Sequence, residues 1–147
     1  MRQIKKRYGI KTDIFHYFEA TIIFGLKLSV IIVNFNSWDD TFELVNQALV
    51  SKVVNDGSCE ILIVDNHSTI SPSAAKTTHH ALKWINRTEN GGFSAGVNEG
   101  ANHATGDWLL LLNPDINLNP DTLERALQMV TQYDGHANQK IGVIGCP

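Results

Sequence analysis

Short runs of apolar residues alternate along this chain with segments whose apolar residues recur every three or four positions. The runs are residues 28–33, 60–64, 82–85 and Trp108–Leu112. Continuous runs of this length, rich in β-branched residues or leucine, predict strands. Residues 28–33 predict a central strand. Because strands of a parallel sheet are covered on both faces, the four leucines at 109–112 predict a strand buried on both sides.

The segment after the first run has the periodicity of a helix. Phe42, Val45 and Leu49 fall on one face of this predicted helix. Asp39 or Asp40 precedes that face and can cap the helix start, because an Asp side chain accepts hydrogen bonds from free backbone amides.

Three further helices are expected. A weak helix opens at residues 71–72, where Pro occupies a tolerated first-turn position. A helix of small residues follows Asn90, Gly91 and Gly92. The last helix starts at residues 119–121, which supply an Asn cap, a Pro and an acid. Its predicted inner face is Leu123, Leu127 and Val130.

The alternation of strands and helices predicts an α/β protein, with a mostly parallel sheet flanked by helices on both faces. One domain covers residues 28–147, and residues 1–27 form an extension that is first basic and then amphipathic. Residues 141–144 predict a fifth strand close to the last residue. We therefore expect the sheet to be incomplete at its C-terminal side.

Charge is distributed unevenly. The 147 residues carry 12 basic and 15 acidic side chains, and five of the basic ones precede the first acid, Asp13. The acidic remainder argues against nucleic-acid binding, which needs a basic face. The basic tip can contact anionic lipid. Two distant cysteines suit a reducing compartment. We expect a cytoplasmic protein, with a peripheral position at the inner face of the plasma membrane as an open alternative.

Polar side chains follow three of the predicted strands at their carboxyl ends. Ligands of open α/β sheets bind at this edge. An acid there can accept hydrogen bonds from a nucleoside, or hold Mg²⁺ or Mn²⁺ and through it a diphosphate. Simple turns are the alternative interpretation of the same residues. The candidates are Asn34, Asn36, Asp65, Asn66, Asn113 and Asp115.

A glycine-rich segment after the third run adds a second group of candidates. Glycines let the backbone approach a ligand closely, and free amides at a helix start favour phosphate. Tight packing of a helix on the sheet is the alternative. The segment is not a dinucleotide fingerprint and follows the wrong strand, which disfavours an oxidoreductase. Its candidate residues are Asn90, Gly91, Gly92, Phe93, Gly96 and Asn98.

Four segments in order, residues 29–36, 64–68, 90–100 and 112–115, resemble the family 2 glycosyltransferases of the GT-A fold, in their bacterial rhamnosyltransferase-like branch. The resemblance implies that Asp65 holds the nucleotide base and that the glycine-rich segment lines a nucleotide-sugar pocket. It also implies a metal site in which Asn113 replaces the first acid, so that Asp115 is the main ligand of Mg²⁺ or Mn²⁺.

The function implied by this resemblance is inverting transfer of a sugar from a dTDP- or UDP-sugar, with rhamnose expected. The acceptor is a cell-surface polysaccharide or a lipid-linked glycan. Family members continue well past this length, and their later half holds the acceptor surface and the general base. Catalytic residues therefore stay unassigned, and we expect residues 1–147 alone to catalyse no transfer and to self-associate. The alternative is a truncated, non-catalytic domain that binds nucleotide or a partner.

Overall fold

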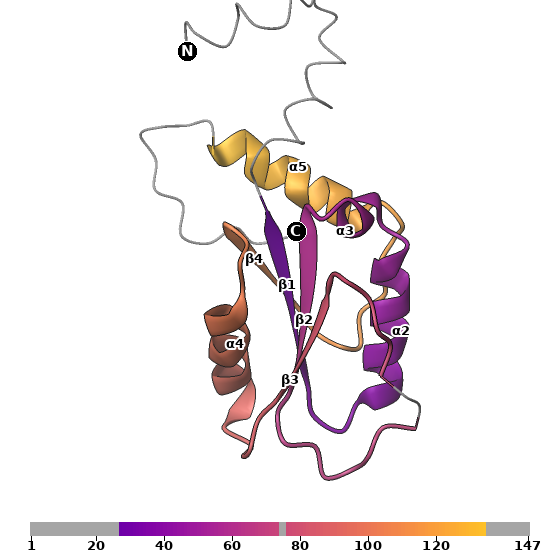
Figure 1. Cartoon of the computed structure of the whole chain (residues 1–147), viewed down its shortest axis with the longest axis vertical. Coiled ribbons are helices and arrows are strands. Elements are labelled where there is room, and N and C mark those ends of the chain that lie inside the picture. Colours follow the sequence, from indigo (N-terminus) through magenta and orange to yellow (C-terminus); the bar gives the residue numbers. More distant parts are fainter. Residues whose placement is uncertain (1–26, 74–75, 135–147) are drawn as a thin grey trace, which may run out of the picture.

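Four parallel strands form the centre of the computed structural model, which describes residues 27–73 and 76–134 (Figure 1). Their order across the sheet is β3-β2-β1-β4, and all three neighbouring pairs are parallel. The predicted α/β class with a mostly parallel sheet is confirmed. The strands are β1 (Leu28–Asn34), β2 (Cys59–Asp65), β3 (Leu82–Asn86) and β4 (Trp108–Leu112).

Helices cover both faces of this sheet, as predicted. Helices α2, α3 and α5 pack into one apolar cluster with one face of β1 and β2, and α4 packs on the opposite face. Figure 1 shows α2 and α4 on opposite sides of the strands. The helices are α2 (Trp38–Leu49), α3 (Lys52–Asn55), α4 (Gly92–His103) and α5 (Thr122–Asp134).

The central strand explains the continuous apolar run at the start of the domain. All seven residues of β1 are buried. Val30 and Ile32 face the cluster beneath α2 and α5, whereas Ile31 and Val33 face α4. Because successive side chains of a strand point to opposite faces, a strand covered on both sides favours apolar residues at successive positions.

The prediction that β4 is buried on both faces is wrong in the described part of the chain. Leu109 and Leu111 are 46% and 47% exposed. Among the described strands β4 lies at the edge of the sheet, and these two leucines pair with Ser29 and Ile31 of β1. They lie on the face that α4 covers over β1 and β2, but α4 does not extend over β4. Four consecutive leucines therefore do not require two covered faces.

Two helix predictions also need correction. Ser37 is the N-cap of α2, so Asp39 and Asp40 lie inside the first turn and do not cap it. The weak helix expected at residues 71–72 does not form, since the described residues between β2 and β3 contain no helix. The fifth strand at 141–144 and nearly all of the N-terminal extension lie outside the described residues. No helix among the described residues is long and apolar enough to cross a bilayer.

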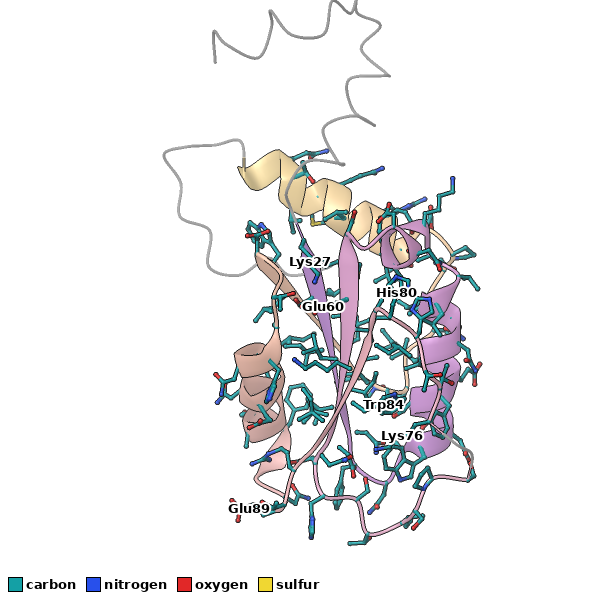
Figure 2. The ribbon with its side chains drawn as sticks, in the orientation of Figure 1. Lys27, Glu60, Lys76, His80, Trp84 and Glu89 are labelled. Carbon is teal, nitrogen blue, oxygen red and sulfur yellow. The ribbon has the colours of Figure 1, made fainter. Side chains whose placement is uncertain are left out.

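A polar cluster ties the strands together at their amino-terminal ends, where Figure 2 shows Lys27 and Glu60. The Glu60 carboxylate accepts hydrogen bonds from the Ser29 hydroxyl (2.6 Å) and the Thr105 hydroxyl (2.8 Å), and it lies 3.5 Å from Lys27 Nζ. Burial alone raises the pKa of this carboxyl, but these hydrogen bonds and Lys27 outweigh burial and lower it. This cluster lies at the opposite ends of the strands from Asn34, Asp65 and Asn86.

Helix α4 lies very close to the central strand because two glycines face it. A Cβ atom added to Gly96 would be 2.6 Å from Val33 Cγ1, and one added to Gly100 would be 2.6 Å from Ile31 Cγ2. Real Cβ atoms do not approach other atoms this closely, so these positions exclude any side chain unless the helix shifts. For Gly96, the alternative interpretation of the glycine-rich segment, tight packing of a helix on the sheet, therefore holds.

Gly100→Ala tests this close approach. The added methyl group forces α4 away from Ile31, and overpacking of this kind costs about 1–3 kcal/mol, more than alanine gains in helix propensity. We expect the free energy of unfolding in urea to fall by about 1–2 kcal/mol. Ser94→Ala, on the exposed start of the same helix, should not lower it. Equal or greater stability of Gly100→Ala would contradict the packing argument.

Candidate functional site

Asp65 ends β2, and one of its two carboxylate oxygens is held firmly by the protein. Its Oδ1 accepts hydrogen bonds from the Ser68 backbone N–H (3.2 Å), from the Ser68 hydroxyl and from Asn34 Nδ2 (3.2 Å). Asp65 itself is only partly buried. The side chain is thus fixed in orientation at the carboxyl edge of the sheet, as predicted for a group that meets a ligand there.

Asn34, the last residue of β1, connects this carboxylate to helix α2. The side chain is completely buried. Its Oδ1 accepts hydrogen bonds from the Ser37 backbone N–H and from the Thr41 hydroxyl, both at 3.1 Å, while its Nδ2 donates to Asp65 and to Ser68. An amide buried this deeply is stable only when its donors and acceptors are paired. Asn34 is therefore a structural member of the site.

Asn36 fastens the loop that follows β2. Its backbone is left-handed, with φ of 58°, and its Oδ1 accepts hydrogen bonds from the backbone N–H groups of Thr69 (2.8 Å) and Ile70 (3.0 Å). Trp38 Nε1 donates to the Ile70 carbonyl oxygen at 2.6 Å. Asn tolerates the left-handed conformation better than most residues. The loop from residue 67 to 70 is thus attached to the segment between β1 and α2.

Lys76, later in the connection between β2 and β3, lies over two aromatic side chains. Lys76 Nζ lies 5.4 Å from the centre of the Trp38 ring and 5.2 Å from that of Trp84. Figure 2 shows Lys76 beside Trp84, on the side of the molecule where α2 lies. Lys76 also donates a hydrogen bond to Asn86 Oδ1 at 2.8 Å. Attraction between an ammonium group and aromatic faces stabilises this arrangement.

Asn66 links the glycine-rich segment to the same edge. Its Nδ2 donates to Asn90 Oδ1 (2.8 Å) and to the Gly92 carbonyl oxygen (3.1 Å), and its Oδ1 accepts from Arg87. Asn90 Oδ1 also accepts from the Gly92 N–H at 2.9 Å. A Cβ atom at Gly91 would lie 2.9 Å from the Arg87 guanidinium. Asn66 of the strand-end candidates and Asn90 and Gly92 of the glycine-rich segment are therefore joined here.

Arg87 was missed by the sequence analysis, although it directly follows β3 at the same sheet edge. It places a permanent positive charge between Asn66 and the glycine-rich segment, where an anionic ligand would be attracted. An arginine one residue beyond a predicted strand was the available sequence signal.

The other predicted residues lie outside these hydrogen-bond networks. Phe93 is exposed at the start of α4, and Asn98, Asn113 and Asp115 are exposed as well. Among the described residues, no group of three or more His, Cys, Asp or Glu side chains could hold a metal ion. A cation at Asp115 fits only if a ligand's phosphates and water complete its coordination, and Mg²⁺ commonly binds in that way.

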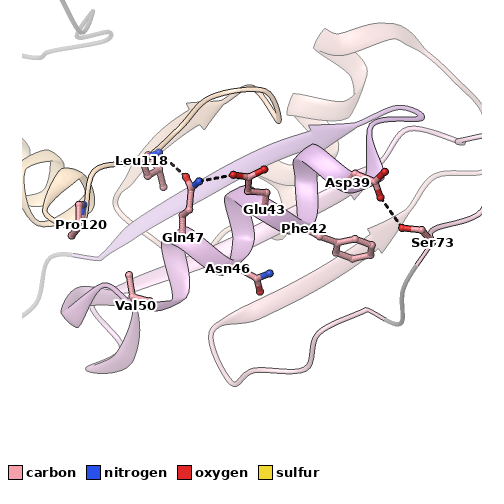
Figure 3. Close-up of a pocket in the computed structure, with 9 residues that line it drawn as sticks. All are labelled: Asp39, Phe42, Glu43, Asn46, Gln47, Val50, Ser73, Leu118 and Pro120. Atoms are coloured by element: carbon pink, nitrogen blue, oxygen red, sulfur yellow. Dashed lines mark hydrogen bonds between the residues drawn. The ribbon is translucent and has the colours of Figure 1, made fainter.

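Two hollows on the surface of the described residues lie away from these candidates. A shallow groove of about 690 Å³ follows the outer side of α2, between Phe42, Gln47 and Leu118 (Figure 3). A smaller one of about 250 Å³ lies beside Lys27 and His80, at the amino-terminal ends of the strands. Neither is lined by a predicted site residue. These two hollows are therefore not the candidate site, which lies at the carboxyl edge of the sheet.

Comparisons with known proteins agree with this picture. The sequence model described as Glycosyl transferase family 2 matches residues 29–144. Among curated proteins, the undecaprenyl-phosphate 4-deoxy-4-formamido-L-arabinose transferase of Sodalis glossinidius is 28% identical over 116 residues, which are 74% of this chain and 35% of that protein. The chain spans about a third of the length of the curated relatives it matches.

Two solved structures share the fold. S. aureus TarS 1–349 in complex with UDP is 22% identical, with a TM-score of 0.60 over 74% of this chain and 33% of that one. The mannosyltransferase PcManGT from Pyrobaculum calidifontis, in complex with GDP-Man and Mn²⁺, is 21% identical, with a TM-score of 0.58 over 86% of this chain and 36% of that one. At these identities the likeness confirms the predicted GT-A type of fold.

Asn36→Ala tests how the site loop is held. It removes the acceptor for the Thr69 and Ile70 amides, and we expect the free energy of unfolding to fall by about 1–3 kcal/mol. Amide hydrogen exchange at Thr69 and Ile70 should accelerate. Asn36→Asp keeps the acceptor oxygen and should retain most of the stability. Asn46→Ala, on the exposed side of α2, is the matched control. Unchanged exchange in Asn36→Ala would refute the role of Asn36.

Proposed function

The chain belongs to glycosyl transferase family 2, and we propose that it forms the donor-binding part of an inverting glycosyltransferase that uses a dTDP- or UDP-sugar. One observation carries this proposal. The edge of the sheet joins an oriented carboxylate, Asp65, to a cation, Arg87, through Asn34 and Asn66. A nucleoside diphosphate has the matching groups, since its base offers N–H donors and its phosphates are anionic.

We assign roles along the edge in the order in which such a ligand would lie. Asp65 accepts a hydrogen bond from the base. Asn66, Asn90, Gly91 and Gly92 border the diphosphate and sugar, and Arg87 offsets part of their negative charge. Phe93 and Asn98, both exposed on α4, are further candidates for contact with this ligand, while Gly96 brings the helix close to the sheet.

The proposed cofactor is Mg²⁺ or Mn²⁺. Asp115 would be its main protein ligand, with Asn113 beside it, both exposed just past β4. The cation supplies Lewis acidity, which neutralises the diphosphate as it leaves the sugar. The Mn²⁺ in the complex of the fold relative PcManGT supports this choice.

The sugar and the acceptor are further parts of the proposal. The motif resemblance favours rhamnose, whereas the relatives are named for other sugars, an arabinose derivative and mannose. Undecaprenyl phosphate in the name of one relative supports a lipid-linked acceptor. That acceptor would place the protein in the cytoplasm, at the inner face of the plasma membrane. The catalytic base is not assigned to any described residue.

Titration of the 147-residue chain with nucleotides tests donor binding. UDP or dTDP should bind in the presence of Mn²⁺, and NAD should not. Asp115→Ala should abolish the metal dependence, because it removes the main protein ligand. Asp121→Ala, which removes another exposed carboxylate, is the control and should retain that dependence. Equal binding in excess chelator would disprove the metal assignment, and failure of all nucleotides to bind would disprove the function.

Asp65→Ala tests contact with the base. We expect uridine or thymidine to bind more weakly by about 1–3 kcal/mol, the range for a hydrogen bond to a charged group. Nucleosides lack phosphate, so their calorimetric titration separates base recognition from diphosphate binding. Asp40→Ala, an exposed acid near the start of α2, should bind like the unmodified chain. Full nucleoside affinity in a folded Asp65→Ala variant would reduce Asp65 to a turn residue.

A further inference from the structure

The two carboxylate oxygens of Asp65 are not equivalent. Oδ1 receives three donors, two from Ser68 and one from Asn34. A carboxylate oxygen offers about two lone-pair sites, so Oδ1 has no capacity left for a ligand. Oδ2 makes no hydrogen bond with the described residues, and it is not among their buried unpaired atoms. Only Oδ2 is therefore available to a nucleotide base.

The direction of the Ser68 proton is fixed by its neighbours. The Ser68 hydroxyl oxygen accepts hydrogen bonds from the Asn36 backbone N–H (2.9 Å) and from Asn34 Nδ2 (3.1 Å). Both of these groups are donors, so the single hydroxyl hydrogen must point to Asp65 Oδ1. This proton blocks Oδ1 as long as the loop keeps its place. Ser68 thus holds Asp65 with one oxygen turned inward and one outward.

A single free oxygen distinguishes between bases. Uracil and thymine each present one donor, N3–H, which one carboxylate oxygen satisfies. Guanine presents two adjacent donors, N1–H and the amino group, which a carboxylate satisfies only by using both oxygens. Guanine bound at Asp65 would leave one of its two donors without an acceptor on Asp65, so guanine would gain less from this contact than uracil or thymine does.

We propose that Ser68 is a specificity-determining residue, which restricts Asp65 to one acceptor oxygen and so selects uracil or thymine nucleotides over guanine nucleotides. This inference rests on the proposed function. Ser68 acts through Asp65 and needs no contact of its own with the ligand. It is a positioning residue, and Asn34 supports it from the end of β1.

Calorimetric titration of the 147-residue chain with UDP, dTDP, GDP and ADP in the presence of Mn²⁺ tests the proposal. We expect UDP and dTDP to bind about tenfold more tightly than GDP, or better, the effect of one unpaired donor. If no nucleotide binds, the proposed function and this inference are both wrong. If GDP binds as well as UDP, donor binding stands and the inference is wrong.

Variants of Ser68 separate the effect of its hydroxyl proton on nucleotide preference from an effect of the shape of the site. In Ser68→Ala the two remaining contacts to Oδ1 are both 3.2 Å long, so the carboxylate can turn and offer both oxygens. We expect GDP affinity to rise and the preference for UDP to narrow to about threefold or less, with ADP unchanged because adenine lacks the paired donors. An equal gain for ADP would indicate a change in pocket size and overturn the role of Ser68.

Two further variants test whether Ser68→Ala changes the nucleotide preference only by disturbing the structure of the loop. Ser68→Thr keeps the hydroxyl group and should restore the full preference for UDP. The Ser73 hydroxyl belongs to the same loop but bonds Asp39 and not Asp65. Ser73→Ala should therefore show the same preference for UDP over GDP as the unmodified chain. Circular dichroism checks that each variant is folded. An unchanged preference in folded Ser68→Ala, or loss of the preference in Ser73→Ala, would contradict the proposal.

Discussion

The buried amide of Asn34 is the constraint on which the rest of the sheet edge depends. It lies at the end of the central strand with no exposed surface. An amide in that position must find its hydrogen bonds inside the protein. It finds them in two directions, toward the start of α2 through Ser37 and Thr41, and toward β2 through Asp65. One side chain thus sets both the entry of the first helix and the orientation of the proposed ligand group.

This constraint works because the strand that carries it cannot move. Every residue of β1 is buried, and α4 is held against it by glycines that leave no room for a side chain. Interiors packed this tightly transmit a displacement instead of absorbing it. The packing of the core therefore fixes the position of the Asn34 amide. Asn34 in turn fixes Asp65 through its hydrogen bond. A site made of strand ends gains its precision from the sheet.

Sequence patterns predicted the strands and most helices because these elements depend on burial, which the apolar pattern records directly. The start of α2 was misplaced because Asn34, from outside the helix, accepts a hydrogen bond from the Ser37 amide, and Ser37 and not Asp39 is the N-cap. The exposure of Leu109 depends on the reach of α4, which no local pattern encodes. The strand-end candidates were predicted from the topology, because ligands of open α/β sheets bind at the carboxyl ends of the strands. Ser68 and Arg87 were missed because contacts that orient them come from residues 21 to 34 positions away in the sequence.

The charges of this edge explain why a cation belongs to the proposed function. After the basic first residues, the chain carries more acids than bases, and Asp65 and Asp115 both follow strands at the edge. A diphosphate placed near Asp115 would be repelled by that carboxylate at short range. Arg87 lies beside Asn66, next to β2, and a divalent ion at Asp115 would act next to β4. The proposed site therefore needs positive charge at both ends, and among the described residues Arg87 supplies it at the end next to β2.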